Sequence, residues 1–140
     1  MASLDTNCLV RWLLDDVPDQ RRRVEALLAD AAPLTVDDAA LIETVFVLES
    51  SARLDRPTIE GLLLAAMSQP LVLDRELWTA VLGVWRDHPK LSVVDIYLAH
   101  KAHAHGDSPL YTFDVKLAHQ VAGVARVPES PPTRPVGEVG

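Results

Sequence analysis

ASLDTNCLVRWLL, residues 2–14, is the stretch that decides the fold. Residues 2–5 are typical of a short buried strand, residues 9–14 are typical of a helix, and the turn between them carries Asp5. Further short strands are expected at residues 33–36, 71–73, 110–113 and 124–127, with helical stretches between them. Because strands that alternate with helices form parallel sheets covered on both faces, we expect an α/β domain.

Helices are expected where apolar side chains recur at helical spacing. Pro18 lies near the start of the first long one, and either Asp37 or Asp38 can cap a later one. Arg56-Pro57-Thr58 is expected to break the chain between two helices. The helices are placed at residues 9–14, 18–32, 38–53, 58–68, 75–87, 92–105 and 114–121.

Size and composition predict one globular domain in the cytoplasm. A chain of 140 residues, 49% hydrophobic, can bury one core. No run approaches the ~18 apolar residues of a membrane span, the opening residues do not resemble a signal peptide, and the single Cys8 suits a reducing compartment. The net charge of −7 lacks the basic character usual for nucleic-acid binding, although bound divalent ions would cancel part of it.

Four acidic residues lie where an expected strand meets a helix or on an apolar helix face. They are Asp5, Glu43, Asp95 and Asp114. Carboxylates in apolar surroundings are costly to bury unless a cation holds them, and two of them about 4 Å apart repel by roughly 4 kcal/mol at an effective dielectric of 20. Since no matching buried Lys or Arg accompanies them, they point to one or two Mg²⁺ or Mn²⁺ ions and to hydrolysis of a phosphate ester.

Each acid also has a structural alternative. Asp5 and Asp114 could be helix N-caps, and Asp95 fits a capping box that starts at Ser92. Glu43 is harder to explain in this way, because its neighbours at helical spacing are apolar and predict a buried face; they are Ala39, Ala40, Phe46 and Val47. Glu49, by contrast, is expected to form a solvated pair with Arg53.

Four segments, taken in order and at their spacing, resemble the PIN domain and within it the VapC-type toxins of bacterial toxin–antitoxin pairs. They are LDTNCLVRWLL, IETVFVLES, VVDIYLAHKA and LYTFDVKLA. The resemblance covers Ser3 to Val127, which places a PIN domain at residues 1–127 and a Pro-rich, flexible tail at residues 128–140. It implies a three-layer sandwich with a mostly parallel central sheet of four to five short strands flanked by helices.

The resemblance further implies a Mg²⁺- or Mn²⁺-dependent endoribonuclease that hydrolyses phosphodiesters with a metal-activated water. Asp5, Glu43, Asp95 and Asp114 match the catalytic, metal-binding acids of the family. Asn7 matches a polar position that can hold a water on the metal, and Thr112 matches a hydroxyl position that orients carboxylates. The implied partners are tRNA or rRNA, a cognate antitoxin and a second copy of the chain. Asp37-Asp38 departs from the pattern and adds negative charge near the site.

Two other functions remain open. A catalytically silent PIN-like binding or scaffold module has no use for four mutually repelling acids. A phosphatase with an aspartyl nucleophile needs D-x-D after the first strand, where Asn7 stands instead of the second acid.

Other conspicuous side chains have simpler explanations. His100, His103 and His105 are expected at a solvated helix end rather than in a zinc site, and Arg21–Arg23 on a solvated face rather than against RNA. Trp78 and Trp85 are expected in the core, and Trp12 in the core or in a partner groove.

Overall fold

Two parallel sheets hold the strands in the computed structural model, which describes residues 1–31 and 33–132. β1 (Ser3–Leu4), β2 (Leu34–Val36) and β3 (Leu71–Val72) form one sheet in that order. β4 (Leu110–Tyr111) and β5 (Ala125–Arg126) form the other, with Leu110 opposite Ala125. The predicted α/β class with five short parallel strands is confirmed. The strands differ from the expectation in lying in two sheets rather than in one central sheet.

Helices follow the strands in the expected alternation. Among the described residues they are α1 (Thr6–Leu14), α2 (Pro18–Asp30), α3 (Asp38–Ser50), α4 (Arg56–Ala66), α5 (Arg75–Asp87), α6 (Val93–Ala104) and α7 (Val115–Gln120). The predicted break at residues 56–58 is wrong, because α4 begins at Arg56. Pro57 lies in its first turn, where the missing N–H is harmless, and Asp55 caps the helix.

Side-chain caps begin most of these helices. Asp5, Asp37, Asp55, Asp74, Ser92 and Asp114 each accept a hydrogen bond from a backbone N–H in the first turn of the helix that follows. Such a cap satisfies an otherwise unpaired donor and contributes about 1 kcal/mol. An aspartate between a strand and a helix is therefore a common structural device in this chain, and the position alone does not indicate a site.

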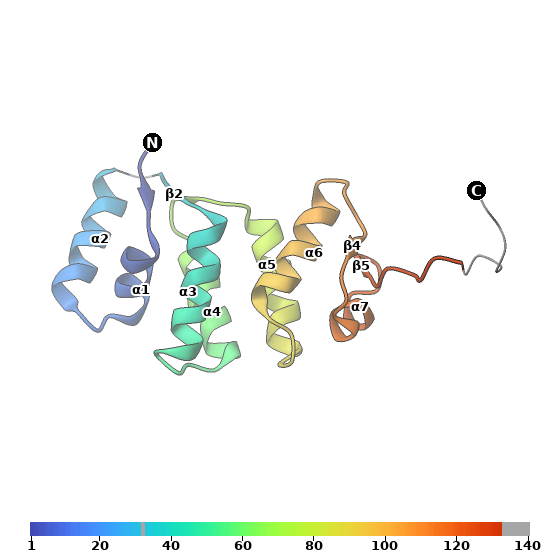
Figure 1. The fold of residues 1–140 in the computed structure, drawn as a ribbon. Coiled ribbons are helices and arrows are strands. Elements are labelled where there is room, and N and C mark those ends of the chain that lie inside the picture. Colours follow the sequence, from blue (N-terminus) through green and yellow to red (C-terminus); the bar gives the residue numbers. More distant parts are fainter. Residues whose placement is uncertain (32, 133–140) are drawn as a thin grey trace.

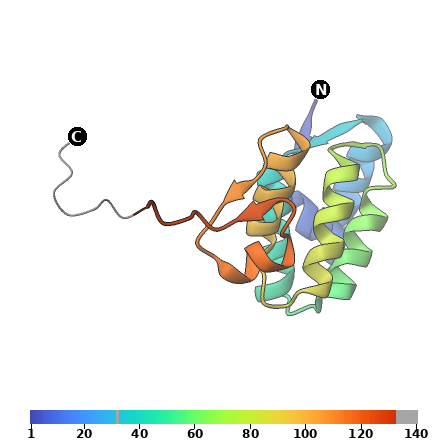
Figure 2. The same cartoon turned by 90° about the vertical axis from the view of Figure 1, so that its right-hand side faces the viewer.

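The elements are arranged along one long axis (Figure 1). β1, α1 and α2 lie toward one end, and β4, β5 and α7 lie at the other, with α3 and α4 and then α5 and α6 between them (Figure 1, Figure 2). α1 packs on α3, α3 on α6, and α4 on α5. One continuous apolar core runs through these contacts and contains Trp78 and Trp85, each 1% exposed, as the sequence predicted.

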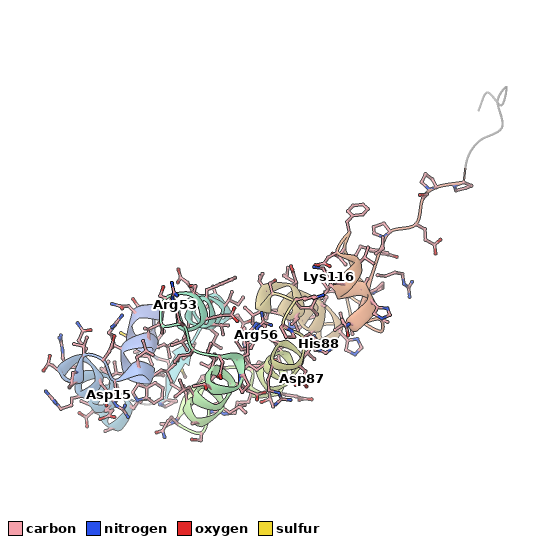
Figure 3. All side chains as sticks on the ribbon, turned by 90° about the horizontal axis from the view of Figure 1, so that it is seen from below. Asp15, Arg53, Arg56, Asp87, His88 and Lys116 are labelled. Atoms are coloured by element: carbon pink, nitrogen blue, oxygen red, sulfur yellow. The ribbon has the colours of Figure 1, made fainter. Side chains whose placement is uncertain are left out.

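Arg56, at the start of α4, connects α3 to the end of α5 (Figure 3). Its Nη1 donates to the carbonyl oxygens of Trp85 at 2.8 Å, His88 at 3.1 Å and Leu91 at 2.9 Å, and its guanidinium stacks over the Trp85 ring. Its Nε donates to Glu49 at 2.9 Å. The predicted partner of Glu49 was wrong.

Arg53 lies beyond the end of α3 with a left-handed backbone, φ 56°, and Arg56 takes its place as the partner of Glu49.

Beyond β5, residues 127–132 form no helix or strand. The rest of the predicted flexible tail, residues 133–140, lies outside the described residues. No helix within the described ranges is both long and apolar enough to span a membrane.

Candidate functional site

Asp5 and Glu43, from distant parts of the chain, face one open pocket of about 490 Å³. β1 delivers Asp5 to its rim and the middle of α3 delivers Glu43. The pocket is lined by Asp5, Thr6, Asn7, Val10, Arg11, Glu43 and Val47. Two of the four predicted acids, together with the supporting Asn7, are thus brought together.

Asp5 has two tasks at this pocket. Its Oδ1 accepts the Cys8 backbone N–H at 2.9 Å and so caps α1, which confirms the structural alternative. The hydrogen bonds from Cys8 lower the pKa of the Asp5 carboxyl, so the group is ionised at neutral pH. Because the residue is exposed, its carboxylate also reaches solvent and the pocket. Capping and ligand binding are therefore compatible here.

Glu43 is held by a residue that the sequence analysis missed. Thr6 Oγ1 donates to Glu43 Oε2 at 2.6 Å, joining the first turn of α1 to α3. Thr6 could have been found from its place directly after Asp5. It begins the first turn of α1 and therefore lies close to the end of β1. The predicted burial of the Glu43 face is wrong: Glu43 is exposed and Phe46 is 45% exposed.

The buried face of α3 is the adjacent one. It consists of Leu41, Thr44, Val45 and Leu48. The Thr44 hydroxyl is satisfied there by donating to the Ala40 carbonyl oxygen at 2.7 Å.

Asp95 and Asp114 lie on other elements and are occupied by local hydrogen bonds. Ser92 Oγ donates to Asp95 Oδ2 at 2.8 Å and accepts the Asp95 N–H at 3.3 Å, as expected for a cap at the start of α6. Asp114 Oδ1 accepts the Leu117 N–H at 3.1 Å and caps α7. Thr112 Oγ1 accepts the Asp114 backbone N–H at 3.0 Å, so it orients the backbone of this acid rather than its carboxylate.

The four acids do not form one cluster. Within residues 1–31 and 33–132, no group of three or more His, Cys, Asp or Glu side chains is arranged to hold a metal ion. His100, His103 and His105 are among the described residues that form no such group. His100 Nδ1 lies 3.0 Å from the Ile96 carbonyl oxygen, and His103 Nδ1 lies 3.3 Å from Ser108 Oγ.

Asp37 and Asp38 are structural residues. Asp37 caps α3 by accepting the Ala39 N–H at 2.8 Å. Asp38 accepts from Trp78 Nε1 at 2.9 Å, from the Tyr97 hydroxyl at 2.6 Å and from Lys101 Nζ at 2.7 Å. Partial burial alone would raise the pKa of Asp38, but these donors outweigh it and lower the pKa. Of the extra charge that the sequence analysis placed near the site, that of Asp38 is thus paired with Lys101, and Asp37 serves as a helix cap.

A comparison with protein families shows which family the chain belongs to. The family described as PIN domain matches residues 2–123, a span that contains all four acids. The chain belongs to the PIN domain family. PIN domains are generally metal-dependent nuclease domains. No curated protein and no solved structure matches the chain significantly.

The pocket of this PIN domain offers oxygen ligands that suit a hard divalent ion. Asp5 and Glu43 supply carboxylates, and Thr6 and Asn7 add a hydroxyl and an amide oxygen. Mg²⁺ commonly binds through one or two carboxylates while it retains several waters. The donor types therefore fit such an ion, but the arrangement supplies half of the expected acid set.

Proposed function

We propose that this PIN domain is a Mg²⁺- or Mn²⁺-dependent endoribonuclease of the VapC toxin type, acting in the cytoplasm. The observation that carries the proposal is the pocket in which Asp5 and Glu43 meet, with Thr6 bridging from one segment to the other. Asp5 and Glu43 would hold one or two ions at this pocket, and Asp95 and Asp114 would have to move to it to complete the ligand set. The ions would supply an activated water for attack on a phosphodiester and stabilise the charge that develops there. The products would carry a 5′-phosphate and a 3′-hydroxyl.

The residues of the pocket have separate tasks in this proposal. The cap hydrogen bonds hold the Asp5 carboxyl ionised and fixed in orientation. Thr6 occupies one oxygen of Glu43 and limits its rotation, which leaves the second oxygen for a ligand. Arg11 lines the same pocket; its Nη1 pairs with Asp16, and the other guanidinium donors would be available to a phosphate of the RNA.

A second cationic surface supports RNA as the substrate. Lys90 and Lys116 line one hollow of about 410 Å³ together with His88 and Asp87. Lys116, His88 and Asp87 are labelled in Figure 3. Arg21–Arg23 are weaker candidates, because each pairs with an acid on the same face. Arg21 lies 3.0 Å from Glu25, and Arg22 and Arg23 lie 3.9 and 3.8 Å from Asp19. We therefore propose Arg11 and the two lysines, rather than Arg21–Arg23, as contacts for the tRNA or rRNA backbone.

The toxin role requires a surface for an antitoxin. An open groove of about 650 Å³ lies between α1, α2 and α4, and its wall includes Trp12, Leu13 and Leu28. An amphipathic helix can place apolar side chains into a groove of this kind. Arg21 and Glu25 at the rim would pair with charged residues of that helix. We therefore assign this groove to the cognate antitoxin, within a toxin that works as a homodimer.

The test is cleavage of total tRNA and rRNA by the purified chain, with Mg²⁺ or Mn²⁺ against EDTA. Asp55→Asn is a matched control for Asp5→Asn, because Asp55 caps α4 with the same 2.9 Å hydrogen bond and lies outside the pocket. We expect metal-dependent cutting that Asp5→Asn abolishes and Asp55→Asn retains. Equal activity of both variants would contradict the assignment of Asp5.

One observation favours the alternative of a catalytically silent binding module. The pocket holds two of the four acids, and within the described chain no third acid joins them. Isothermal titration with Mn²⁺ distinguishes the alternatives, since a silent module has no need for the ion. Absence of both Mn²⁺ binding and RNA cleavage by folded protein would favour the silent module.

A further inference from the structure

A second hollow adjoins the pocket of Asp5 and Glu43. It has a volume of about 250 Å³ and shares Asn7 and Arg11 with that pocket, so the two are continuous along one face of α1. The other side of the hollow is formed by α2, which packs against α1 at one end of the molecule (Figure 1). We refer to it as the α1–α2 hollow, and it is lined by Asn7, Cys8, Arg11, Gln20, Arg23, Val24 and Leu27.

The α2 side of the hollow is a single helix face. Gln20, Arg23 and Leu27 recur at helical spacing, and Val24 in the same row is only 4% exposed. Arg21 instead lines the groove assigned to the antitoxin, which has no lining residue in common with the α1–α2 hollow. A ligand in the hollow and an antitoxin helix in the groove would therefore contact different residues of α2.

The lining combines apolar side chains with hydrogen-bond donors. Cys8 is half-buried, Val24 is buried and Leu27 is 44% exposed, and together they give the hollow an apolar floor. Gln20 and Arg23 are exposed and bring polar groups to it. The lining residues, all of them in the described part of the chain, include no Asp or Glu, although acids outnumber Lys and Arg by 20 to 13 in the sequence. Such a surface suits an uncharged ring with hydrogen-bond acceptors better than it suits a cation.

One unstacked nucleobase matches these properties. Pockets for whole drug-sized ligands enclose about 300–1,000 Å³. A hollow of about 250 Å³ therefore suits a smaller group such as a single base. Single-stranded RNA presents bases that can be splayed out, stacked on a side chain and hydrogen-bonded at their edges. Because Asn7 and Arg11 also line the pocket of Asp5 and Glu43, that base would belong to a nucleotide next to the phosphodiester that is cut.

Arg23 has the donors to recognise the edge of such a base. It lies 3.8 Å from Asp19, and the two side chains are 75% and 71% exposed. A pair this exposed contributes little to stability, so the guanidinium can turn toward the hollow at little cost. Arginine offers donors only, which suits the O4 of uracil or the O6 of guanine. The amino groups at the same positions of cytosine and adenine are donors themselves and would be left unpaired opposite it.

We propose that the α1–α2 hollow is a base subsite of the nuclease, which accepts uracil or guanine next to the scissile phosphodiester of single-stranded RNA. In this subsite Arg23 and Gln20 contact the edge of the base, the apolar floor contacts its face, and Arg11 contacts the adjoining phosphate. The inference rests on the proposed nuclease function and adds a sequence preference at the cut. It gives Arg23 a contact with a base, which is distinct from the backbone contacts assigned to Arg11 and the lysines.

Cleavage of a single-stranded RNA pool, randomised around one position and sequenced at the product ends, tests the preference. In Mn²⁺ the wild-type chain should favour a keto base over an amino base by about tenfold in kcat/KM at one position beside the cut. Arg23→Ala should reduce this ratio to about twofold or less, because the amino bases are no longer opposed by a fixed donor. Cutting by the wild-type chain without any base preference would overturn the subsite and leave the nuclease function standing.

Arg22→Ala is the matched control for Arg23→Ala. Arg22 lies 3.9 Å from the same Asp19, on the same helix, but does not line the hollow. Both variants remove one positive charge and weaken the general attraction of RNA alike, so only a specific contact separates them. Arg22→Ala should retain the base preference. Equal loss of preference in the two variants would assign the effect to charge alone and overturn the subsite.

Alkylation of Cys8 tests occupancy of the hollow without any cleavage. Cys8 is the single cysteine of the chain and lines the hollow. Its reaction with iodoacetamide is followed in EDTA, with short oligouridylate or oligocytidylate at concentrations at which fluorescence anisotropy shows each strand to be bound. Oligouridylate should slow the reaction several-fold more than oligocytidylate, in the wild type and in Arg22→Ala but not in Arg23→Ala. Bound strands that protect Cys8 equally, or not at all, would overturn the subsite even if the chain cuts RNA. Failure both to bind and to cut RNA would overturn the nuclease function, and the subsite with it.

Discussion

α3 carries two acidic residues, Asp38 and Glu43, whose surroundings are opposite in kind. At its first turn, Asp38 is half-buried and receives three donors: an indole, a phenol and an ammonium group. Just over one turn later, Glu43 is exposed to an open pocket and receives one hydroxyl. We refer to Asp38, Trp78, Tyr97 and Lys101 as the Asp38 network, and to Asp5, Thr6 and Glu43 as the acid pocket.

The difference separates a structural acid from a candidate functional one. A carboxylate has about four acceptor sites, and the Asp38 network fills most of them and supplies the counter-charge. Such a group has little capacity left for a ligand, and it fixes helices in place. The acid pocket leaves most acceptor sites of Glu43 and Asp5 to solvent or a ligand. Substitutions in the first region should therefore change stability, and substitutions in the second should change activity.

The largest effect is expected for Glu43→Gln. Loss of the charge at a metal ligand should lower kcat by more than about 100-fold, since even the outer partners of metal ligands usually cost about 10- to 100-fold. Because Glu43 is exposed, the free energy of unfolding should change by less than about 0.5 kcal/mol. RNA cleavage and urea unfolding of the same preparation check both statements. A large loss of stability with normal kcat would place Glu43 with the structural acids.

Asp38→Ala is the opposite case. It leaves the Trp78 indole, the Tyr97 hydroxyl and the Lys101 ammonium group without their acceptor, which should cost about 2–3 kcal/mol of unfolding free energy. The cost is limited because Lys101 can turn to solvent. Cleavage per folded molecule should be unchanged.

Asp37→Asn is the matched control for Asp38→Ala, because asparagine retains the cap of α3. It should alter urea unfolding by a few tenths of a kcal/mol. If both variants unfold like the wild type, the Asp38 network is not what holds α3 to α5 and α6.

Thr6→Val sharpens the comparison within the acid pocket. It removes the only side-chain donor that the described chain gives Glu43 while keeping the shape of the side chain. We expect a loss of about tenfold in kcat/KM and weaker Mn²⁺ binding by calorimetry, because the carboxylate is no longer oriented. Thr6→Ser restores the hydroxyl and should restore both. Rescue by Ser but not by Val is the decisive pattern, since a packing role would rank the two in the other order.

Local chemistry predicted the elements and some of the contacts. The bounds of α5 were predicted to the residue, and the caps at Asp5, Ser92 and Asp114 follow from where strands give way to helices. The buried face of α3 was not predictable in the same way. The helix is apolar on both sides of Glu43, so periodicity does not distinguish the face of Val45 from the face of Phe46. Only packing against neighbouring helices decides between them.

The partners of Asp38 lie beyond sequence reasoning for a related reason. Trp78, Tyr97 and Lys101 stand 40 to 63 residues away in the chain, and their convergence depends on how α5 and α6 cross α3. The division of the strands into two sheets is also a tertiary result. Alternating strands and helices predict parallel pairing, but very short strands carry too few hydrogen bonds to specify which neighbour each one takes.

The smallest effect is expected in the pH dependence of stability, which separates charge from shape in the Asp38 network. The pKa of Asp38 is lowered below its ordinary value of 3.8 in the folded protein, so folding favours the ionised form. The stabilisation that this provides is present above the unfolded-state pKa and is lost as the pH falls through the folded-state pKa. The difference in unfolding free energy between wild type and Asp38→Asn should thus be constant from pH 5 to 7 and shrink below about pH 4.

The same comparison made in a Lys101→Met variant tests whether this pH dependence comes from the ion pair between Asp38 and Lys101. With the ammonium group removed, Tyr97 and Trp78 still donate to residue 38, but the main preference for the charged carboxylate is lost. The difference between Asp38 and Asp38→Asn in that background should vary much less between pH 3 and 7. An undiminished pH dependence would assign the lowered pKa to the neutral donors, and the Asp38 network would then hold its acid through hydrogen bonding rather than through counter-charge.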